Sequence, residues 1–142
     1  LIKKTPDVKF DLYGMENIQP VWADNFINAI SQSKIGLNLS QGKAAKHYSS
    51  DRFAQLIGNG LLVMIDQNTE FSDFFKKDEI IFYKNINDLS EKVSKYSNDN
   101  ILRKKIAEKG TNKYFKYFNS TKVAQYIIDK TFDIKSNKFY WD

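Results

Sequence analysis

The sequence contains no cysteine and a single histidine, and these two shortages exclude several kinds of chemistry. Without cysteine there can be no disulfide framework, no thiolate zinc site and no cysteine nucleophile. With His47 as the one histidine, a metal site built from several histidines is excluded, and a Ser/His/Asp triad could be built only around this residue. No apolar run approaches the roughly 20 residues needed to span a bilayer, and the N-terminus lacks the apolar region of a signal peptide.

Arginine is also scarce, because only Arg52 and Arg103 accompany the lysines among 22 basic residues. Lysine is a flexible, well-hydrated charge that often serves solubility. The net charge of +5 fits an anionic ligand without requiring nucleic acid, so we do not expect nucleic-acid binding. A length of 142 residues, with 42% hydrophobic and 27% charged residues, predicts one globular domain over residues 1–142. Because the chain begins with Leu1 rather than Met, we expect a fragment of something longer.

Short apolar runs alternate with helical patterns, which is typical of an α/β domain with a parallel sheet of about four strands and helices on both faces. The most distinctive run, residues 61–65, is entirely apolar, as in a strand buried on both faces. The other predicted strands are residues 8–13, 34–39 and 80–83. The predicted helices are residues 22–33, 50–59, a short one near 69–75, and three closing helices at 87–96, 100–118 and 120–132.

Several residues carry predictions about where these elements end and pack. Asp24, Asn98 and Asn119 are placed to cap helices, and Gly110 is expected to interrupt or bend the helix over 100–118. Tyr114 and Phe118 share one face of that helix and are expected in the core. The tail, residues 133–142, ends in three aromatic residues that have no evident partner within the chain, Phe139-Tyr140-Trp141.

Ligands of open parallel sheets bind at the carboxyl ends of the strands, and the richest loop there follows residue 39. It leads through serines into the helix over 50–59, whose free backbone N–H groups and dipole favour an anion. Gln55, one turn into the helix, could bond a sugar hydroxyl. These features suit a sugar nucleotide, and the candidate binding residues of this segment are Ser40, Gly42, Lys43, Ser49, Ser50, Arg52 and Gln55.

A less specific interpretation also remains open. A strand, loop and helix with serines and scattered lysines occur in many α/β domains that bind nothing there. Asp51, in the first turn, would compete with a phosphate for the same N–H groups. Lys46 also lies within reach of this loop, but a lysine there fits a loop that binds phosphate and a loop that binds no ligand equally well.

Residues 50–62, 71–75 and 80–83 resemble the C-terminal domain of group 1 glycosyltransferases, in particular the branch related to spore-maturation glycosyltransferases. That branch has an Arg-x-x-Ile-Ala-x-x-Gly element near its end, which here is Leu102-Arg103-Lys104-Lys105-Ile106-Ala107-Glu108-Lys109-Gly110. The resemblance covers roughly residues 23–132. It implies the Rossmann-like C-terminal half of a two-domain GT-B enzyme, in which this half binds the nucleotide-sugar donor.

The resemblance further implies a metal-independent transferase of the hexosyltransferase type, acting in glycan or polysaccharide synthesis. The donor would be a nucleotide-diphosphate sugar with no other cofactor, and the partner an N-terminal acceptor-binding domain. Two glutamates eight positions apart bracket the donor in related retaining enzymes, and these positions are His47 and Gln55 here. His47 would lie near the donor sugar or a phosphate. No residue is assigned with certainty to catalysis, and Glu70 lies where donor-sugar loops often occur.

His47 and Gln55 stand where related enzymes have glutamate, and this difference leaves other functions open. The chain could be a non-catalytic α/β module, either a degenerate glycosyltransferase or a domain that binds nucleic acid or another protein. We expect a cytoplasmic protein without a transmembrane segment, and contact with a membrane surface stays open.

Overall fold

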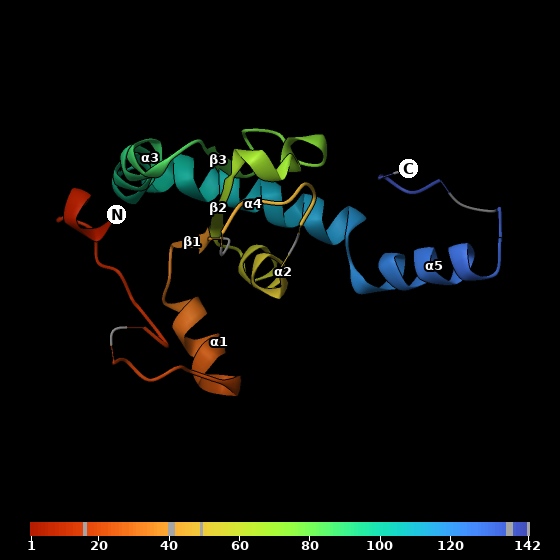
Figure 1. Ribbon diagram of the computed structural model, residues 1–142, viewed down its shortest axis with the longest axis horizontal. Coiled ribbons are helices and arrows are strands. Elements are labelled where there is room, and N and C mark those ends of the chain that lie inside the picture. Colours follow the sequence, from red (N-terminus) through yellow and green to blue (C-terminus); the bar gives the residue numbers. More distant parts are fainter. Residues whose placement is uncertain (16, 40–41, 49, 136–137, 142) are drawn as a thin grey trace.

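The protein is an α/β domain, seen in a computed structural model that describes residues 1–15, 17–39, 42–48, 50–135 and 138–141 (Figure 1). Its sheet has three parallel strands in the order β1-β2-β3. The strands are β1 (Ile35–Asn38), β2 (Leu62–Asp66) and β3 (Ile81–Tyr83). The helices are α1 (Ala23–Ser31), α2 (Asp51–Gly58), α3 (Ile86–Asn98), α4 (Asn100–Tyr117) and α5 (Ser120–Thr131), with 3-10 turns η1 (Ile2–Lys4), η2 (Gln67–Thr69) and η3 (Phe71–Asp73).

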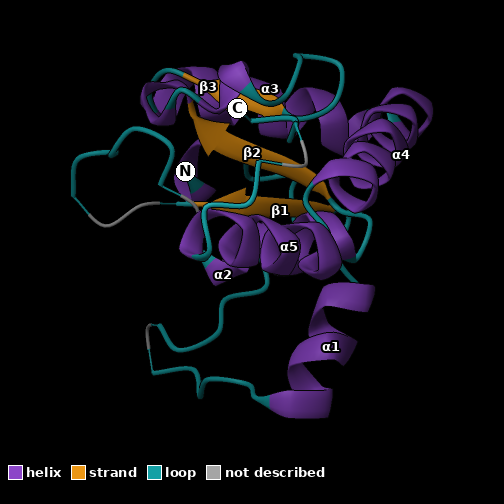
Figure 2. Cartoon of the chain, turned by 90° about the vertical axis from the view of Figure 1, so that its right-hand side faces the viewer, coloured by secondary structure: helices purple, strands orange, loops and turns teal. Residues whose placement is uncertain are grey.

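Strand β2 lies at the centre of the sheet, as its unbroken apolar sequence predicts (Figure 2). Its register places Leu62 beside Ile35 of β1, and Met64 beside Ile81 of β3. Because side chains alternate along a strand, β2 contributes to both faces of the sheet. One face belongs to a core with α1, α2 and the aromatic residues of the segment 71–75, and the other to a core with α3 and the first half of α4.

Two glycines allow unusually close packing around this sheet. A Cβ on Gly36 of β1 would lie 2.8 Å from the Leu56 side chain of α2. A Cβ on Gly110 would lie 2.2 Å from the carbonyl oxygen of Glu79. Helix α4 continues through Gly110, so the expectation of an interruption there is wrong, and the expected bend stays a prediction. The glycine is needed because α4 passes directly over the backbone that leads into β3.

The predicted strand over residues 8–13 does not form, and the sheet has three strands rather than about four. The alternating pattern is real, because Val8 and Phe10 pack against the core with α3 while Lys9 and Asp11 are exposed. Alternation reports which side chains face apolar neighbours and not whether a hydrogen-bonding strand lies alongside. This segment runs beside the core as an extended chain outside the sheet.

The predicted helix ends are partly correct. Asn119 accepts a hydrogen bond from Lys122 N and caps α5. Helix α4 is capped by Asp99 rather than by Asn98. Asp24 lies inside the first turn of α1, which begins after Trp22 without a side-chain cap. An acidic residue in the first turn stabilises the same helix end through the dipole, which explains the error.

The aromatic tail has partners within the chain, which corrects the expectation that it has none. The Tyr140 ring stacks on Tyr117 with centroids 4.4 Å apart, and Trp141 stacks on Phe118 at 5.4 Å. Phe118 and Tyr114 pack against the core, as predicted. Long-range pairing of this kind leaves no local pattern in the sequence.

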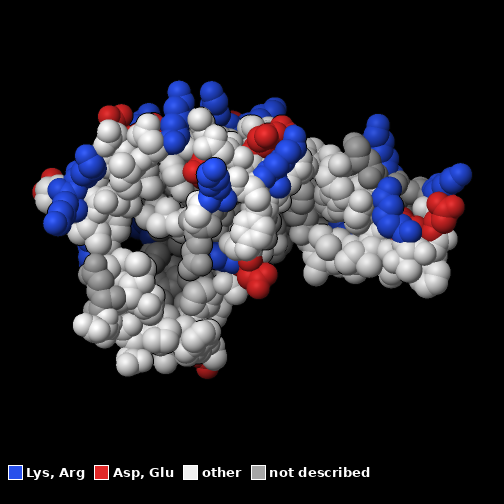
Figure 3. Space-filling view, in the orientation of Figure 1, with Lys and Arg blue, Asp and Glu red and all other residues white. Residues whose placement is uncertain are grey.

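Charge is unevenly distributed over the surface. Lysine and arginine side chains gather along the upper side, over α3 and the segment leading to β3, whereas the lower sides of α1 and α5 carry few charges (Figure 3). Helix α5 extends away from the rest of the domain (Figure 1). Within the described ranges, no helix is both long enough and apolar enough to cross a membrane.

Candidate functional site

The carboxyl end of β1 meets the start of α2, and a partly buried polar contact defines this junction. The Ser50 hydroxyl donates to Oδ1 of Asn38 at 2.9 Å, and Asn38 is only 3% exposed. Ser50 is the N-cap residue of α2, yet its side chain makes no capping hydrogen bond to the helix. The first N–H groups of α2 therefore have no side-chain acceptor from their own cap, and they carry the positive end of the helix dipole.

Arg52 lies at the same junction, in the first turn of α2. Its Nη1 donates to the carbonyl oxygen of Leu39 at 3.1 Å, just beyond the end of β1. The guanidinium is exposed and forms no ion pair with any residue that the structure describes. Gln55 is also exposed and follows Arg52 by three residues, which places the two on neighbouring parts of one helix face. Asp51 lies in the first turn beside them.

The loop after β1 is joined to the segment after β2 by several contacts. The backbone N–H of His47 donates to the carbonyl oxygen of Thr69 at 2.8 Å. The His47 ring lies 2.9 Å from Oδ2 of Asp73 and packs on Phe74 with centroids 4.6 Å apart. Both His47 and Glu70 have a left-handed backbone conformation, with φ of 54°. The two loops at the carboxyl edge of the sheet thus form one surface.

A second charge pair reinforces this surface. Lys46 Nζ lies 2.6 Å from Oε2 of Glu70, and this carboxylate raises the pKa of Lys46 through its hydrogen bond and its charge. Both side chains are well exposed, so this ion pair contributes little to stability. Lys43 is exposed and makes no ion pair within the described part of the chain. It follows Gly42, whose positive φ of 75° suits a turn.

His47, Glu70 and Asp73 could together hold a cation, since their ligand atoms lie within 4.8 Å of one another. All three are exposed, and the amine of Lys46 already occupies a Glu70 oxygen. The Glu70 carboxylate contacts the amine of Lys46 and the Asp73 carboxylate contacts the His47 ring, so both carboxylates have partners without a cation. The expectation of a metal-independent site stays a prediction.

The structure brings several of the predicted residues together and leaves others unplaced. Ser50 and Arg52 meet at the end of β1, and Gln55 lies one turn further along α2. His47 lies on the facing loop, and no hydrogen bond joins it to Gln55 among the described residues. Ser40 and Ser49 lie outside the described residues.

Sequence reasoning missed two residues of this surface. Asn38 is the last residue of an otherwise apolar strand, and that position could have indicated a polar group facing the site. Asp73 lies 26 residues beyond His47, and no local signal joins the two. Only the parallel pairing of β1 with β2 places their loops side by side.

The chain belongs to a glycosyl transferase-like family. The family model described as glycosyl transferase-like matches residues 1–129, which is most of the chain. No curated protein and no solved structure matches the chain. The domain is therefore a glycosyltransferase domain of the Rossmann-like α/β type, in agreement with the three-stranded parallel sheet.

Proposed function

We propose that this domain binds a nucleotide-diphosphate sugar at the carboxyl edge of the sheet and serves as the donor-binding part of a glycosyltransferase. The observation that carries the proposal is the junction of β1 with α2. There the cap residue of the helix turns its hydroxyl toward Asn38, and Arg52 lies beside N–H groups that lack a side-chain cap. A helix start of this kind, with a guanidinium next to it, favours a phosphate group.

Each candidate residue has a role in this proposal. The first N–H groups of α2 and the Arg52 guanidinium hold the diphosphate, and Lys43 adds a charge from the loop. Lys46 and His47 approach a phosphate after exchanging their present carboxylate partners for it. Gln55 hydrogen-bonds the ribose, as its place one turn along the helix allows.

The N–H groups and cations that bind the diphosphate also assist the transfer of the sugar. When the sugar leaves, negative charge grows on the nucleoside diphosphate, and fixed N–H groups and cations next to that charge lower the barrier. The domain thus stabilises the leaving group by electrostatics. The acceptor and a general base come from a further domain, as the resemblance to group 1 glycosyltransferases implies. Transfer of a hexose, independence from metal and membership of the spore-maturation branch are parts of the same proposal.

Binding of nucleotides is the direct test. Thermal shifts are measured with UDP, GDP, ADP, CMP and the corresponding sugars, each with and without EDTA. We expect one nucleoside diphosphate to stabilise the domain equally with and without EDTA. Stabilisation that disappears with EDTA would contradict metal independence. No stabilisation by any nucleotide would contradict the donor site itself.

The role of Arg52 is tested with a matched control. Arg52→Ala is expected to weaken nucleotide binding about 10- to 100-fold, since a hydrogen bond to a charged group is worth roughly 1.5–3 kcal/mol. Lys104→Ala removes the same charge from an exposed position on α4 and is expected to leave binding unchanged. If Arg52→Ala binds the nucleotide as well as the wild type does, the assigned role of Arg52 is wrong.

A further inference from the structure

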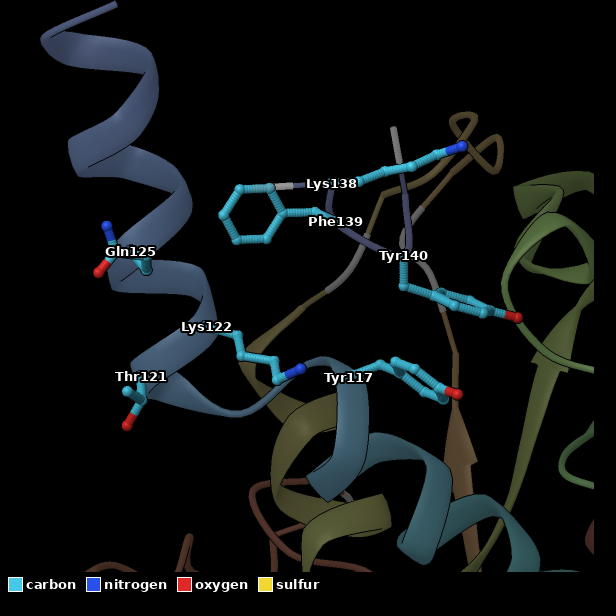
Figure 4. A pocket seen from close by; sticks show the side chains of 7 residues that line it. All are labelled: Tyr117, Thr121, Lys122, Gln125, Lys138, Phe139 and Tyr140. Atoms are coloured by element: carbon cyan, nitrogen blue, oxygen red, sulfur yellow. The ribbon is translucent and has the colours of Figure 1, made fainter. Parts of the chain in front are cut away.

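A concave surface lies away from the junction of β1 with α2. This groove has a volume of about 620 Å³ and is formed by the end of α4, the first half of α5 and the tail (Figure 4). Its lining combines aromatic rings, two lysines and two short polar side chains: Tyr117, Thr121, Lys122, Gln125, Lys138, Phe139 and Tyr140. We call it the tail groove.

Aromatic rings build the walls of the tail groove. Tyr117 and Tyr140 stack on each other, with an angle of 28° between their planes. Phe139 directs its ring from the tail toward α5 (Figure 4), and this ring packs on that of Tyr126 with centroids 5.2 Å apart and planes at 85°. Tyr140 stacks on one face of Tyr117 and Trp141 on one face of Phe139, so the opposite face of each ring is the one that a ligand ring would contact.

The charge of the groove is positive. Lys122 directs its amine toward Tyr117, and its Nζ lies 5.9 Å from the centroid of that ring (Figure 4). Lys138 runs along the rim and points away from α5. Neither lysine forms an ion pair with a described carboxylate, unlike Lys109 and Lys113 on α4. The groove can therefore accept an anion without breaking an existing ion pair.

The tail groove is connected to the candidate donor site. The Tyr140 hydroxyl donates to the carbonyl oxygen of Phe74 at 3.2 Å. The ring of Phe74 in turn packs on His47. A ligand in the groove would thus lie beside Tyr140, which is hydrogen-bonded to the segment 71–75 that supports the donor site.

We propose that the tail groove binds an anionic pyranose, a six-membered sugar ring carrying a phosphate or carboxylate group, as a second ligand beside the donor. Lys122 balances the anionic group, and the rings of Tyr117 and Phe139 contact the apolar face of the sugar. That the ligand is a sugar rests on the proposed function, whereas the need for an anion and a ring rests on the groove itself.

Trp141 provides a reporter for this binding. Its ring stacks near Phe139, with centroids 5.5 Å apart and planes 21° apart. The other tryptophan, Trp22, is the N-cap residue of α1 and is 75% exposed, so a Trp22→Phe background leaves Trp141 as the one source of tryptophan fluorescence. The probes are glucose 6-phosphate, glucuronate, glucose and inorganic phosphate.

Saturable changes in Trp141 fluorescence are expected with glucose 6-phosphate or glucuronate, and which of the two binds more tightly identifies the anionic group. Glucose and inorganic phosphate are expected to bind roughly tenfold more weakly or worse, since each lacks half of the contacts. Lys122→Ala is expected to weaken binding roughly tenfold, whereas Lys104→Ala should have no effect. Phe139→Leu keeps an apolar side chain but should weaken binding by removing the flat face.

Three results would overturn the proposal. The first is the lack of a saturable signal with either anionic sugar. The second is binding of inorganic phosphate as tight as that of glucose 6-phosphate. The third is an equal affinity in Lys122→Ala and Lys104→Ala.

Arg52→Ala separates this proposal from the donor site. It should weaken the nucleotide response about 10- to 100-fold and leave the sugar response intact, and an equal loss of both would show that the sugar occupies the donor site instead. A sugar response in the absence of any nucleotide response would refute the donor site alone.

Discussion

Replacement of Gly110 by alanine tests how closely α4 approaches the sheet. The added Cβ would lie 2.2 Å from the carbonyl oxygen of Glu79, more than 1 Å inside the 3.4 Å at which ordinary contact begins. This oxygen belongs to the backbone and cannot rotate away. The Glu79 side chain is itself held by Lys76 N and by Lys113 Nζ, each at 2.7 Å. Either α4 or the segment before β3 must therefore move.

The magnitude follows from two opposing effects. Overpacking of this kind costs about 1–3 kcal/mol, and the rigid neighbour favours the upper end. Alanine in place of glycine inside a helix returns about 1 kcal/mol. We therefore expect Gly110→Ala to lower the free energy of unfolding by about 2 kcal/mol, measured by urea denaturation and circular dichroism.

Gly58→Ala is the matched control, because Gly58 is also helical and a Cβ there would meet only Phe115 and Tyr114, at 3.9 and 4.0 Å. This variant should be as stable as the wild type or up to about 1 kcal/mol more stable. Equal stability of Gly110→Ala and the wild type would refute the close approach of α4. A loss of equal size in both variants would point to a general effect of replacing a helical glycine rather than to the close approach at Gly110.

Two further stability measurements concern α3. Asn85 accepts hydrogen bonds from Asn87 N and Asp88 N, so Asn85→Ala should cost about 1 kcal/mol, and an unchanged urea midpoint would show that the cap is dispensable. Asp88 accepts from Lys92 Nζ and from Lys84 N, which lower its pKa below the usual 3.8. A lowered pKa stabilises the fold above pH 3.8, and this contribution is lost as the pH falls through the folded-state pKa. Asp88→Asn should therefore cost about 1 kcal/mol at pH 7 and progressively less below pH 3.8; a difference independent of pH would contradict this assignment.

Sequence patterns predicted the central part of the fold because local chemistry determines it. The apolar run that became β2, the amphipathic spacing of α2 and the turn at Gly60 each depend on neighbours along the chain. The segment 8–13 shows the limit of this reasoning. Its side chains alternate between buried and exposed, but a strand also needs hydrogen-bonding partners, and these are supplied by the tertiary structure.

The candidate site was predictable to a similar degree. The pattern of strand, polar loop and helix indicated Ser50 and Arg52, since anion sites at helix starts follow from backbone geometry. It could not indicate that Ser50 would turn toward Asn38, or that Glu70 and Asp73 would take Lys46 and His47 as partners. Those contacts depend on which strands pair.

The segment after β2 is the element that links the two proposed ligand sites. Thr69, Phe71 and Phe75 are buried, so this segment is fixed by the core. From that fixed position it offers a carbonyl oxygen to the backbone of His47, and the Phe74 carbonyl to the hydroxyl of Tyr140. Because burial already fixes this segment, it loses little conformational entropy when a ligand binds, and this favours affinity at both proposed sites. It also means that the loop after β1 and the aromatic tail can each exchange contacts with a ligand while the sheet and its core keep their positions.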